Sequence, residues 1–238
     1  MVNWGNVVYF YKFSCLKILF GYSFCIVIFL RLEMPSFDFE NEVNGIVVGI
    51  DEAGRGPWVG PVVAGAVVFV NRDVNPYLLD NLNDSKKISK KKREMLYNLL
   101  LEEQDKGNIK IGIAEASAKE IDDINILNAT FLAMNRALDK CGVEPCLVLI
   151  DGNKVPKNFK YMAKAVVKGD AKSYSISAAS IMAKVYRDKL MEDMAEKYPY
   201  YGFENNAGYG TKEHIEALKK YGITPEHRKS YKPIKEYL

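Results

Sequence analysis

The chain has 238 residues, enough for one domain with a substantial core, and 48% of them are hydrophobic and 26% charged. This balance is ordinary for a globular protein, and it excludes a repeat or low-complexity chain. The net charge of +3 is smaller than nucleic-acid-binding domains often carry, but lysine and arginine gather in two stretches, at residues 86–93 and 219–235.

Residues 1–33 differ from the rest of the chain because they are rich in Phe, Tyr, Ile, Leu and Cys. The thirteen residues Ile18–Leu30 carry no charge, fewer than the 18 or more expected of a membrane span. Leu30-Arg31-Leu32-Glu33 contains no small-residue cleavage site. Three interpretations stay open, namely a membrane anchor, a poor signal sequence, or upstream sequence ahead of a true start at Met34.

We favour a start at Met34, with residues 34–238 forming the domain, its C-terminal segment beginning near residue 198, and no contact with a membrane. The protein is then expected in the cytoplasm. Cysteine usage fits a reducing compartment, since no Cys-x-x-Cys pair occurs. Two of the four cysteines, Cys141 and Cys146, flank a predicted turn, and we expect them to be small buried residues and not a disulfide or metal site.

The first strand is expected at residues 46–51, with both faces buried, and it ends in the acids Asp51 and Glu52. A turn containing Gly54, Arg55 and Gly56 joins it to a second strand at 61–70. A carboxylate left unpaired at the end of a buried strand is costly, and a divalent cation would remove that cost. Because neighbouring strand residues point to opposite faces, the two acids can share a metal only if the strand ends or twists there.

The later elements alternate between strands and helices. We expect strands at 109–116, 147–151 and 161–167, a helix after the N-cap Ser89, a short helix after the N-cap Ser117, and longer helices at 125–141, 171–197 and 211–221. Residues 198–203 should break the long helix predicted at 171–197. This order predicts a mixed sheet with helices on both faces.

Two further acids follow later strands. Asp151 ends the fourth strand directly before Gly152, and Asp170 follows the fifth strand. Each acid has a purely structural alternative: Asp51-Glu52 a solvated strand end, Asp151 a turn residue, and Asp170 a cap of the next helix. Carboxylate oxygens are hard ligands, and they would suit Mg²⁺ or Mn²⁺ and not structural zinc.

Five segments in order resemble the type 2 ribonuclease H (ribonuclease HII) family, over roughly residues 45–234. They are residues 49–60 (GIDEAGRGPWVG), 83–87 (NDSKK), 150–153 (IDGN), 168–188 (KGD followed by SAASIMAKVYRD), and the C-terminal pair 208–214 (GYGTKEH) and 225–230 (PEHRKS). Trp58 departs from the family pattern, in which a smaller aliphatic residue is common at that place.

The resemblance implies an α/β protein with the ribonuclease H-like fold, a five-stranded mixed sheet flanked by helices, and a helical C-terminal part. It places the family's metal-binding, catalytic acids on Asp51, Glu52, Asp151 and Asp170. Two ions, Mg²⁺ or Mn²⁺, would then clamp an in-line phosphoryl displacement that needs no His, Ser or Cys nucleophile. His214 and His227 are accordingly expected to be structural or to face the substrate.

The resemblance also implies how substrate is read. Gly54, Arg55 and Gly56 would sense a 2′-hydroxyl, and Tyr209 would stack on the deoxyribose after the ribonucleotide. Structural alternatives are a surface salt bridge for Arg55 and a packed core aromatic for Tyr209. Phosphate contacts are expected from Lys86, Lys87, Lys184 and Arg187.

The expected function is an endoribonuclease that cuts the RNA strand of RNA–DNA hybrids and ribonucleotides embedded in duplex DNA, in DNA replication and repair. We expect a monomer without a small-molecule cofactor. The alternatives are a type 3 ribonuclease H, which would need a larger N-terminal domain, and a non-catalytic hybrid-binding protein, which should lack at least one acid.

Overall fold

The computed structural model describes residues 34–157 and 159–238. The three interpretations of residues 1–33 therefore lie outside the described residues, as do Cys15 and Cys25. Within the described ranges, no helix is both long enough and apolar enough to cross a membrane. Cys141 is buried, as expected, whereas Cys146 is exposed, and neither forms a disulfide.

A five-stranded mixed sheet forms the centre of the fold, in the order β3-β2-β1-β4-β5. β1 pairs antiparallel with β2 and parallel with β4, so the sheet changes type at β1. β2 pairs antiparallel with β3, and β4 pairs parallel with β5. The strands are β1 (Val47–Ala53), β2 (Val62–Phe69), β3 (Ile109–Ala116), β4 (Leu147–Asp151) and β5 (Ala163–Val166). The predicted mixed sheet is confirmed.

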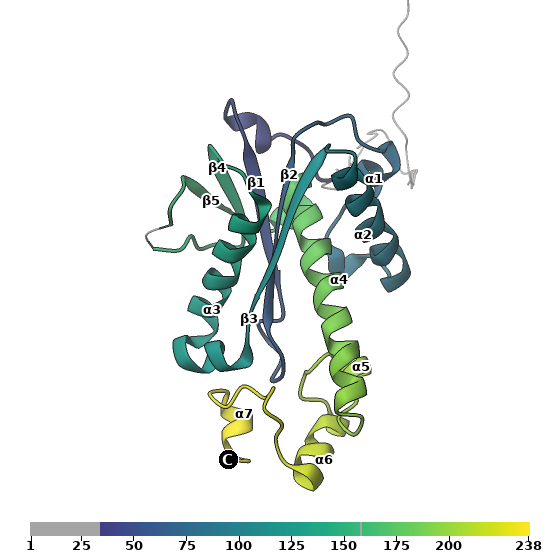
Figure 1. Ribbon diagram of the computed structural model, residues 1–238, viewed down its shortest axis with the longest axis vertical. Helices are drawn as coiled ribbons and strands as arrows, with labels where there is room; N and C mark the ends of the chain where they lie inside the picture. Colours follow the sequence, from purple (N-terminus) through teal and green to yellow (C-terminus); the bar gives the residue numbers. More distant parts are fainter. Residues whose placement is uncertain (1–33, 158) are drawn as a thin grey trace, which may run out of the picture. The chain divides into compact units, whose positions relative to one another are not determined.

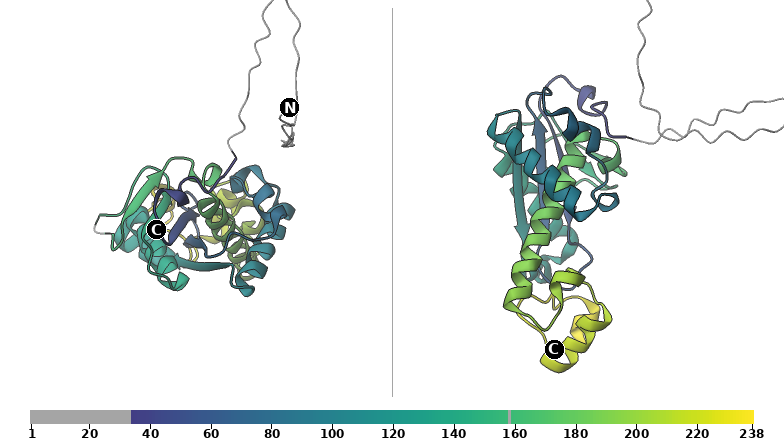
Figure 2. Two further views of the ribbon diagram at one scale, coloured as in Figure 1. Left: turned by 90° about the horizontal axis from the view of Figure 1, so that it is seen from above. Right: turned by 90° about the vertical axis from the view of Figure 1, so that its right-hand side faces the viewer.

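Helices cover both faces of this sheet (Figure 1; Figure 2, left). On one face α3 (Ala118–Cys141) packs over residues such as Val48 and Ile50. On the other, α4 (Tyr174–Lys197) packs together with α1 (Pro76–Asn81) and α2 (Lys90–Asp105). β1 and β2 are thus buried on both sides, which is why their sequences are continuous hydrophobic runs and not alternating ones.

Helix boundaries follow the capping residues. Ser89 and Ser117 are N-caps as predicted, and Ser117 forms a reciprocal capping box with Glu120. Asn125 has φ +66° inside α3 and separates a short helix from a longer one, as the sequence predicted. The long helix begins three residues later than expected because Ser173 caps it. β1 does not end at Asp51 as expected but continues to Ala53.

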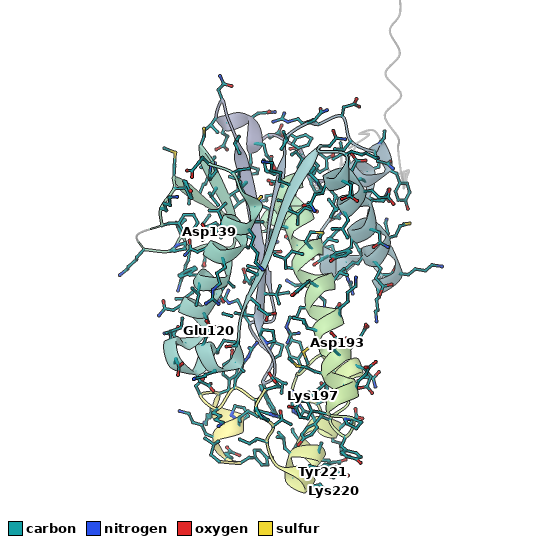
Figure 3. The ribbon with its side chains drawn as sticks, viewed as in Figure 1. Glu120, Asp139, Asp193, Lys197, Lys220 and Tyr221 are labelled. Carbon is teal, nitrogen blue, oxygen red and sulfur yellow. The ribbon has the colours of Figure 1, made fainter. Side chains whose placement is uncertain are left out.

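The C-terminal part contains three short helices with a small core of their own, α5 (Phe203–Asn206), α6 (Lys212–Tyr221) and α7 (Lys232–Lys235). It lies beside the last turns of α4, where Figure 3 marks Lys197, Lys220 and Tyr221. Trp58 and Val59, from the turn between β1 and β2, pack into this core. The predicted helical C-terminal part is therefore joined directly to the glycine turn.

A short segment before β1 forms hydrogen bonds with the start of α4. η1 (Glu40–Glu42) buries the Glu40 carboxylate, whose Oε1 accepts hydrogen bonds from the Ser173 hydroxyl (2.7 Å), the Ser175 hydroxyl (2.6 Å) and the Ser175 amide (3.0 Å). The Ser36 amide donates to the Lys172 carbonyl. Residues 36–43 are thus part of the folded domain.

We predict that Glu40→Ala lowers the free energy of unfolding by about 2–4 kcal/mol, because three buried donors lose their acceptor. The matched control is Glu42→Ala, which removes a half-exposed ion pair with Lys164 and should cost less than about 1 kcal/mol. Denaturant unfolding of chains starting at Met34 measures both. Equal losses of unfolding free energy in the two variants would contradict a stabilising role for the Glu40 hydrogen bonds.

Candidate active site

Asp51 and Glu52 lie inside β1, at the point where that strand loses one of its neighbours. Pairing of β1 with β4 stops at Ile50, whereas pairing with β2 continues opposite both acids. Asp51 is 6% exposed and contacts Ser180 of α4. Glu52 is directed elsewhere, since its Oε1 accepts a hydrogen bond from Arg55 (3.1 Å). The edge of β1 at these two acids is therefore open because β4 no longer pairs there, and not because β1 ends, as the sequence predicted.

A hydrogen bond between Asp151 and the residue before Asp170 holds these two acids near each other. Asp151 ends β4, and its Oδ1 accepts the amide of Gly169 (2.7 Å), the first residue of η3 (Gly169–Ala171). That short turn carries Asp170 next to Asp151. Because the cap of α4 is Ser173, capping does not account for Asp170.

The acids form one electrostatic cluster. Burial, followed by the charges of Glu52 and Asp151, raises the pKa of Asp51 well above its ordinary value. Burial also raises the pKa of Glu52, although Arg55 opposes this. The pKa of Asp170 rises to about 6, chiefly through burial and then through Asp151 and Asp84. The pattern indicates carboxylates whose negative charge is only partly balanced by the nearby basic groups.

A divalent cation would supply the remaining counter-charge. Across residues 34–157 and 159–238, no group of three or more His, Cys, Asp or Glu side chains is already gathered around one point. The oxygens accept protein donors instead, for example Asp51 Oδ1 from the Glu52 amide (2.7 Å). The all-oxygen donor set with raised pKa values fits Mg²⁺ or Mn²⁺, and charge repulsion explains why the carboxylates stand apart.

Sequence reasoning missed three residues at this cluster. Asp84 lies close enough to Asp170 to raise its pKa, and Ser85, in η2 (Ser85–Lys87), shares a 2.9 Å hydrogen bond with Ser180. Ser180 in turn lies close enough to Asp51 to oppose the rise in its pKa. All three lie within the segments that carry the family resemblance. A search for polar residues in those segments, and not only for metal-binding acids, could have found them.

A pocket of about 340 Å³ adjoins the acids. Asp51 and Glu52 form one wall, and Gly54, Arg55, Gly56 and Tyr209 form another. The Tyr209 side chain is 52% exposed, so it is not a packed core aromatic. A Cβ at residue 56 would stand 3.3 Å from the Tyr209 ring, so the ring lies directly against Gly56. The glycine turn and Tyr209 thus form one surface.

Two buried arginines hold the glycine turn in place. Arg228, 0% exposed, donates to the carbonyls of Gly54 (2.6 Å), Arg55 (3.0 Å), Pro57 (2.7 Å) and Gly60 (2.9 Å). Arg187, 2% exposed, donates to the carbonyls of Val59, Pro61 and Ala207. Gly54 has φ +94°, and a Cβ there would stand 2.1 Å from Arg187 Nε, so only glycine fits.

The four basic residues expected at phosphates occupy different positions. Lys86, Lys184 and Arg187 line the pocket, and Lys86 is close enough to Glu52 and Asp170 to oppose the rise in their pKa values. Lys184 pairs with Asp188 (2.5 Å). Lys87 does not line this pocket, and Arg187 has a structural role at the turn, so their phosphate contacts stay predictions. Arg55 does form the salt bridge considered above, but with Glu52.

Comparison with known proteins identifies relatives over nearly the whole described region. A family model described as Ribonuclease HII matches residues 48–234. A ribonuclease HII of Rhodospirillum rubrum is 51% identical over 86% of this chain and 92% of its own length. One from the Wolbachia of Brugia malayi is 48% identical over 84% and 94%. The crystal structure of ribonuclease H2 from Pyrococcus horikoshii superposes with a TM-score of 0.65 at 29% identity, over 81% of this chain and 96% of that one.

We predict that Mg²⁺ or Mn²⁺ raises the melting temperature more at about pH 7.5 than at about pH 5. Asp170 has a folded-state pKa near 6, above its ordinary value, so metal-free stability is highest below the ordinary pKa and falls as pH rises through 6. A cation binds the deprotonated form and restores this loss. Thermal unfolding with chelator and with metal at both pH values measures the effect, and an equal metal-induced rise at both would contradict it.

Proposed function

The chain belongs to the ribonuclease HII family of endoribonucleases, which act on RNA–DNA hybrids, and we propose that it also cuts at single ribonucleotides embedded in duplex DNA. Hydrolysis would break the bond between phosphorus and the 3′ oxygen, and leave a 3′-hydroxyl and a 5′-phosphate. The observation that supports the proposal is that Asp51 and Glu52 share a pocket with the glycine turn, while Asp151 is near enough to raise the pKa of both Asp51 and Asp170.

We propose that Asp51, Glu52, Asp151 and Asp170 hold two divalent ions, Mg²⁺ or Mn²⁺. Bound ions of this kind supply an activated water for attack and neutralise charge on the leaving oxygen. The raised pKa values of Asp51, Glu52 and Asp170 support this role, because each carboxylate gains most when a cation replaces its proton. Ser180 of α4 lies near Asp51 and would help to orient its carboxylate.

The chain's own groups would bind and orient the nucleic acid. Among the backbone hydrogen bonds of the described residues, the amides of Arg55 and Gly56 donate to no carbonyl, so they are free to meet a 2′-hydroxyl. Tyr209, against Gly56, would stack on the next deoxyribose. Lys86 would contact a phosphate near the acids, and Lys184 could do so after leaving Asp188.

We further propose that the protein acts as a monomer without a small-molecule cofactor, in DNA replication and repair in the cytoplasm, and that residues 1–33 take no part in catalysis or membrane contact. The direct test incubates the purified chain, with and without Mg²⁺, with a duplex that holds one ribonucleotide. Cleavage 5′ to that ribonucleotide only with metal is expected. Absence of cleavage both with Mg²⁺ and with Mn²⁺ in its place would reject the proposal.

We predict that Asp51→Asn lowers kcat by at least about 100-fold, or roughly 3 kcal/mol, because one metal ligand is lost. Its melting temperature without metal should not fall at neutral pH, since a repelling buried carboxylate is neutralised. The control is Asp193→Asn, at an exposed acid farther along α4 (Figure 3). Near-native cleavage by Asp51→Asn at saturating Mg²⁺ would contradict the ligand role.

A second prediction concerns Tyr209→Ala, which should lower kcat/KM at a single embedded ribonucleotide about tenfold, as expected for one lost stacking contact. A continuous hybrid should suffer less, because its next sugar carries a 2′-hydroxyl that crowds the ring. Tyr221→Ala is the control, since Tyr221 is also exposed but stacks on Tyr200 in the C-terminal part (Figure 3). If Tyr209→Ala impairs both substrates equally, Tyr209 does not read the junction.

A further inference from the structure

Two buried histidines, which the proposed hydrolysis does not use, lie directly behind Tyr209. His214, in the first turn of α6, is 0% exposed, and His227 is 1% exposed. Their Nε2 atoms are 3.0 Å apart. The other nitrogen of His214 lies 2.9 Å from the Tyr209 carbonyl oxygen, and the other nitrogen of His227 lies 2.9 Å from the Thr224 amide.

The hydrogen-bond pattern assigns both tautomers. The Thr224 amide can only donate, so His227 Nδ1 accepts and the proton of neutral His227 is on Nε2. That proton is donated to Nε2 of His214, whose own proton must then be on Nδ1 and is donated to the Tyr209 carbonyl. A directed chain of hydrogen bonds therefore runs from Thr224 to Tyr209.

This chain fixes the backbone of Tyr209 while its ring stays exposed. The Tyr209 amide donates to the Asn206 carbonyl (2.9 Å), and the Tyr209 carbonyl also accepts from the Thr211 amide (2.8 Å). Trp58 packs against His214 at 5.7 Å between ring centroids, and its amide donates to Gly208 (2.8 Å). The support behind Tyr209 is thus continuous with the glycine turn that its ring contacts.

We propose that His214 and His227 are positioning residues for substrate reading, and that they hold the Tyr209 ring against Gly56 at the distance needed to contact the sugar after a ribonucleotide. The inference rests on the proposed role of Tyr209. It gives the C-terminal segment a specific role. Residues 224–227 contain the first hydrogen bond of the series, and residues 209–214 contain the last one, at the Tyr209 carbonyl.

The pair works only while both rings are neutral. A second proton on His214 would place its Nε2–H against the Nε2–H of His227 over 3.0 Å, and a second proton on His227 would place its Nδ1–H against the Thr224 amide over 2.9 Å. Burial lowers the pKa of both histidines, that of His227 to about 4. The neighbouring rings are Trp58, Tyr201 and Phe203. The nearby charged groups are engaged elsewhere: Glu213 lies against Gly202, Glu226 pairs with Lys197, and Arg228 holds the glycine turn.

Two substitutions of His214 separate positioning from stability. In His214→Asn the side-chain amide occupies the place of Nδ1 and can still donate to the Tyr209 carbonyl. In His214→Gln it reaches the place of Nε2, keeps the bond to His227 and loses the bond to Tyr209. Each variant loses one buried hydrogen bond, so we expect similar drops in melting temperature.

The measurement is the ratio of kcat/KM on a single embedded ribonucleotide to kcat/KM on a continuous hybrid. We expect His214→Gln to lower this ratio about five- to tenfold, toward that of Tyr209→Ala, and His214→Asn to keep it within about threefold of native. Equal ratios in the two variants would overturn the proposal. A native chain without any preference for the junction would instead reject the proposed role of Tyr209 itself.

A second readout needs neither activity nor a variant of the pair. Trp4→Phe leaves Trp58 as the single tryptophan, and a protonated His214 beside it should quench its emission. We expect the quenching transition well below pH 6.5, with circular dichroism recording whether the fold persists. A transition near pH 6.5 in the folded protein would overturn the neutral hydrogen-bond chain.

Discussion

The glycine turn between β1 and β2 depends on the buried side chains of Arg187 and Arg228, neither of which forms an ion pair with any described residue. A buried guanidinium is costly unless its N–H groups are satisfied, and here backbone carbonyls from residues 54–61 and 207 satisfy most of them. Each bond turns a carbonyl of the turn inward. Arg55 and Gly56 line the pocket together with Asp51, Glu52 and Tyr209, and among the described residues their amides donate to no backbone carbonyl.

The acids depend on a different feature, the unequal lengths of β1 and β4. Had β4 continued beside Asp51 and Glu52, neighbouring backbone would cover that edge, and the two side chains would lie on separate faces of a closed sheet. Because β4 ends first, Asp51 remains among α4 residues while Glu52 lines both the main pocket and a second one on the α3 side. A nucleic-acid strand can thus approach the cluster where the two faces meet.

Much of this could be predicted from local sequence. The five strands, the caps at Ser89 and Ser117 and the break at Asn125 follow from short-range patterns of hydrophobicity and capping. The four acids could be selected as candidate ligands because each comes at or after the end of a predicted strand and matches a segment that resembles the family. The roles of Arg187 and Arg228 could not be predicted, since in the sequence they are ordinary basic residues, and their carbonyl partners in residues 54–61 lie more than 120 residues away. The directions of Asp51 and Glu52 likewise required the register of β1 against β4.

The link between Arg228 and the glycine turn also affects when the enzyme becomes complete during its synthesis. Arg228 lies 168 residues after Gly60, so at about 5–20 residues per second a ribosome needs roughly 10–30 s to deliver it after the turn has been made. By then all four acids have been translated, whereas the turn still lacks its support. A nascent chain therefore carries the four acids before the turn beside them has the hydrogen bonds of Arg228.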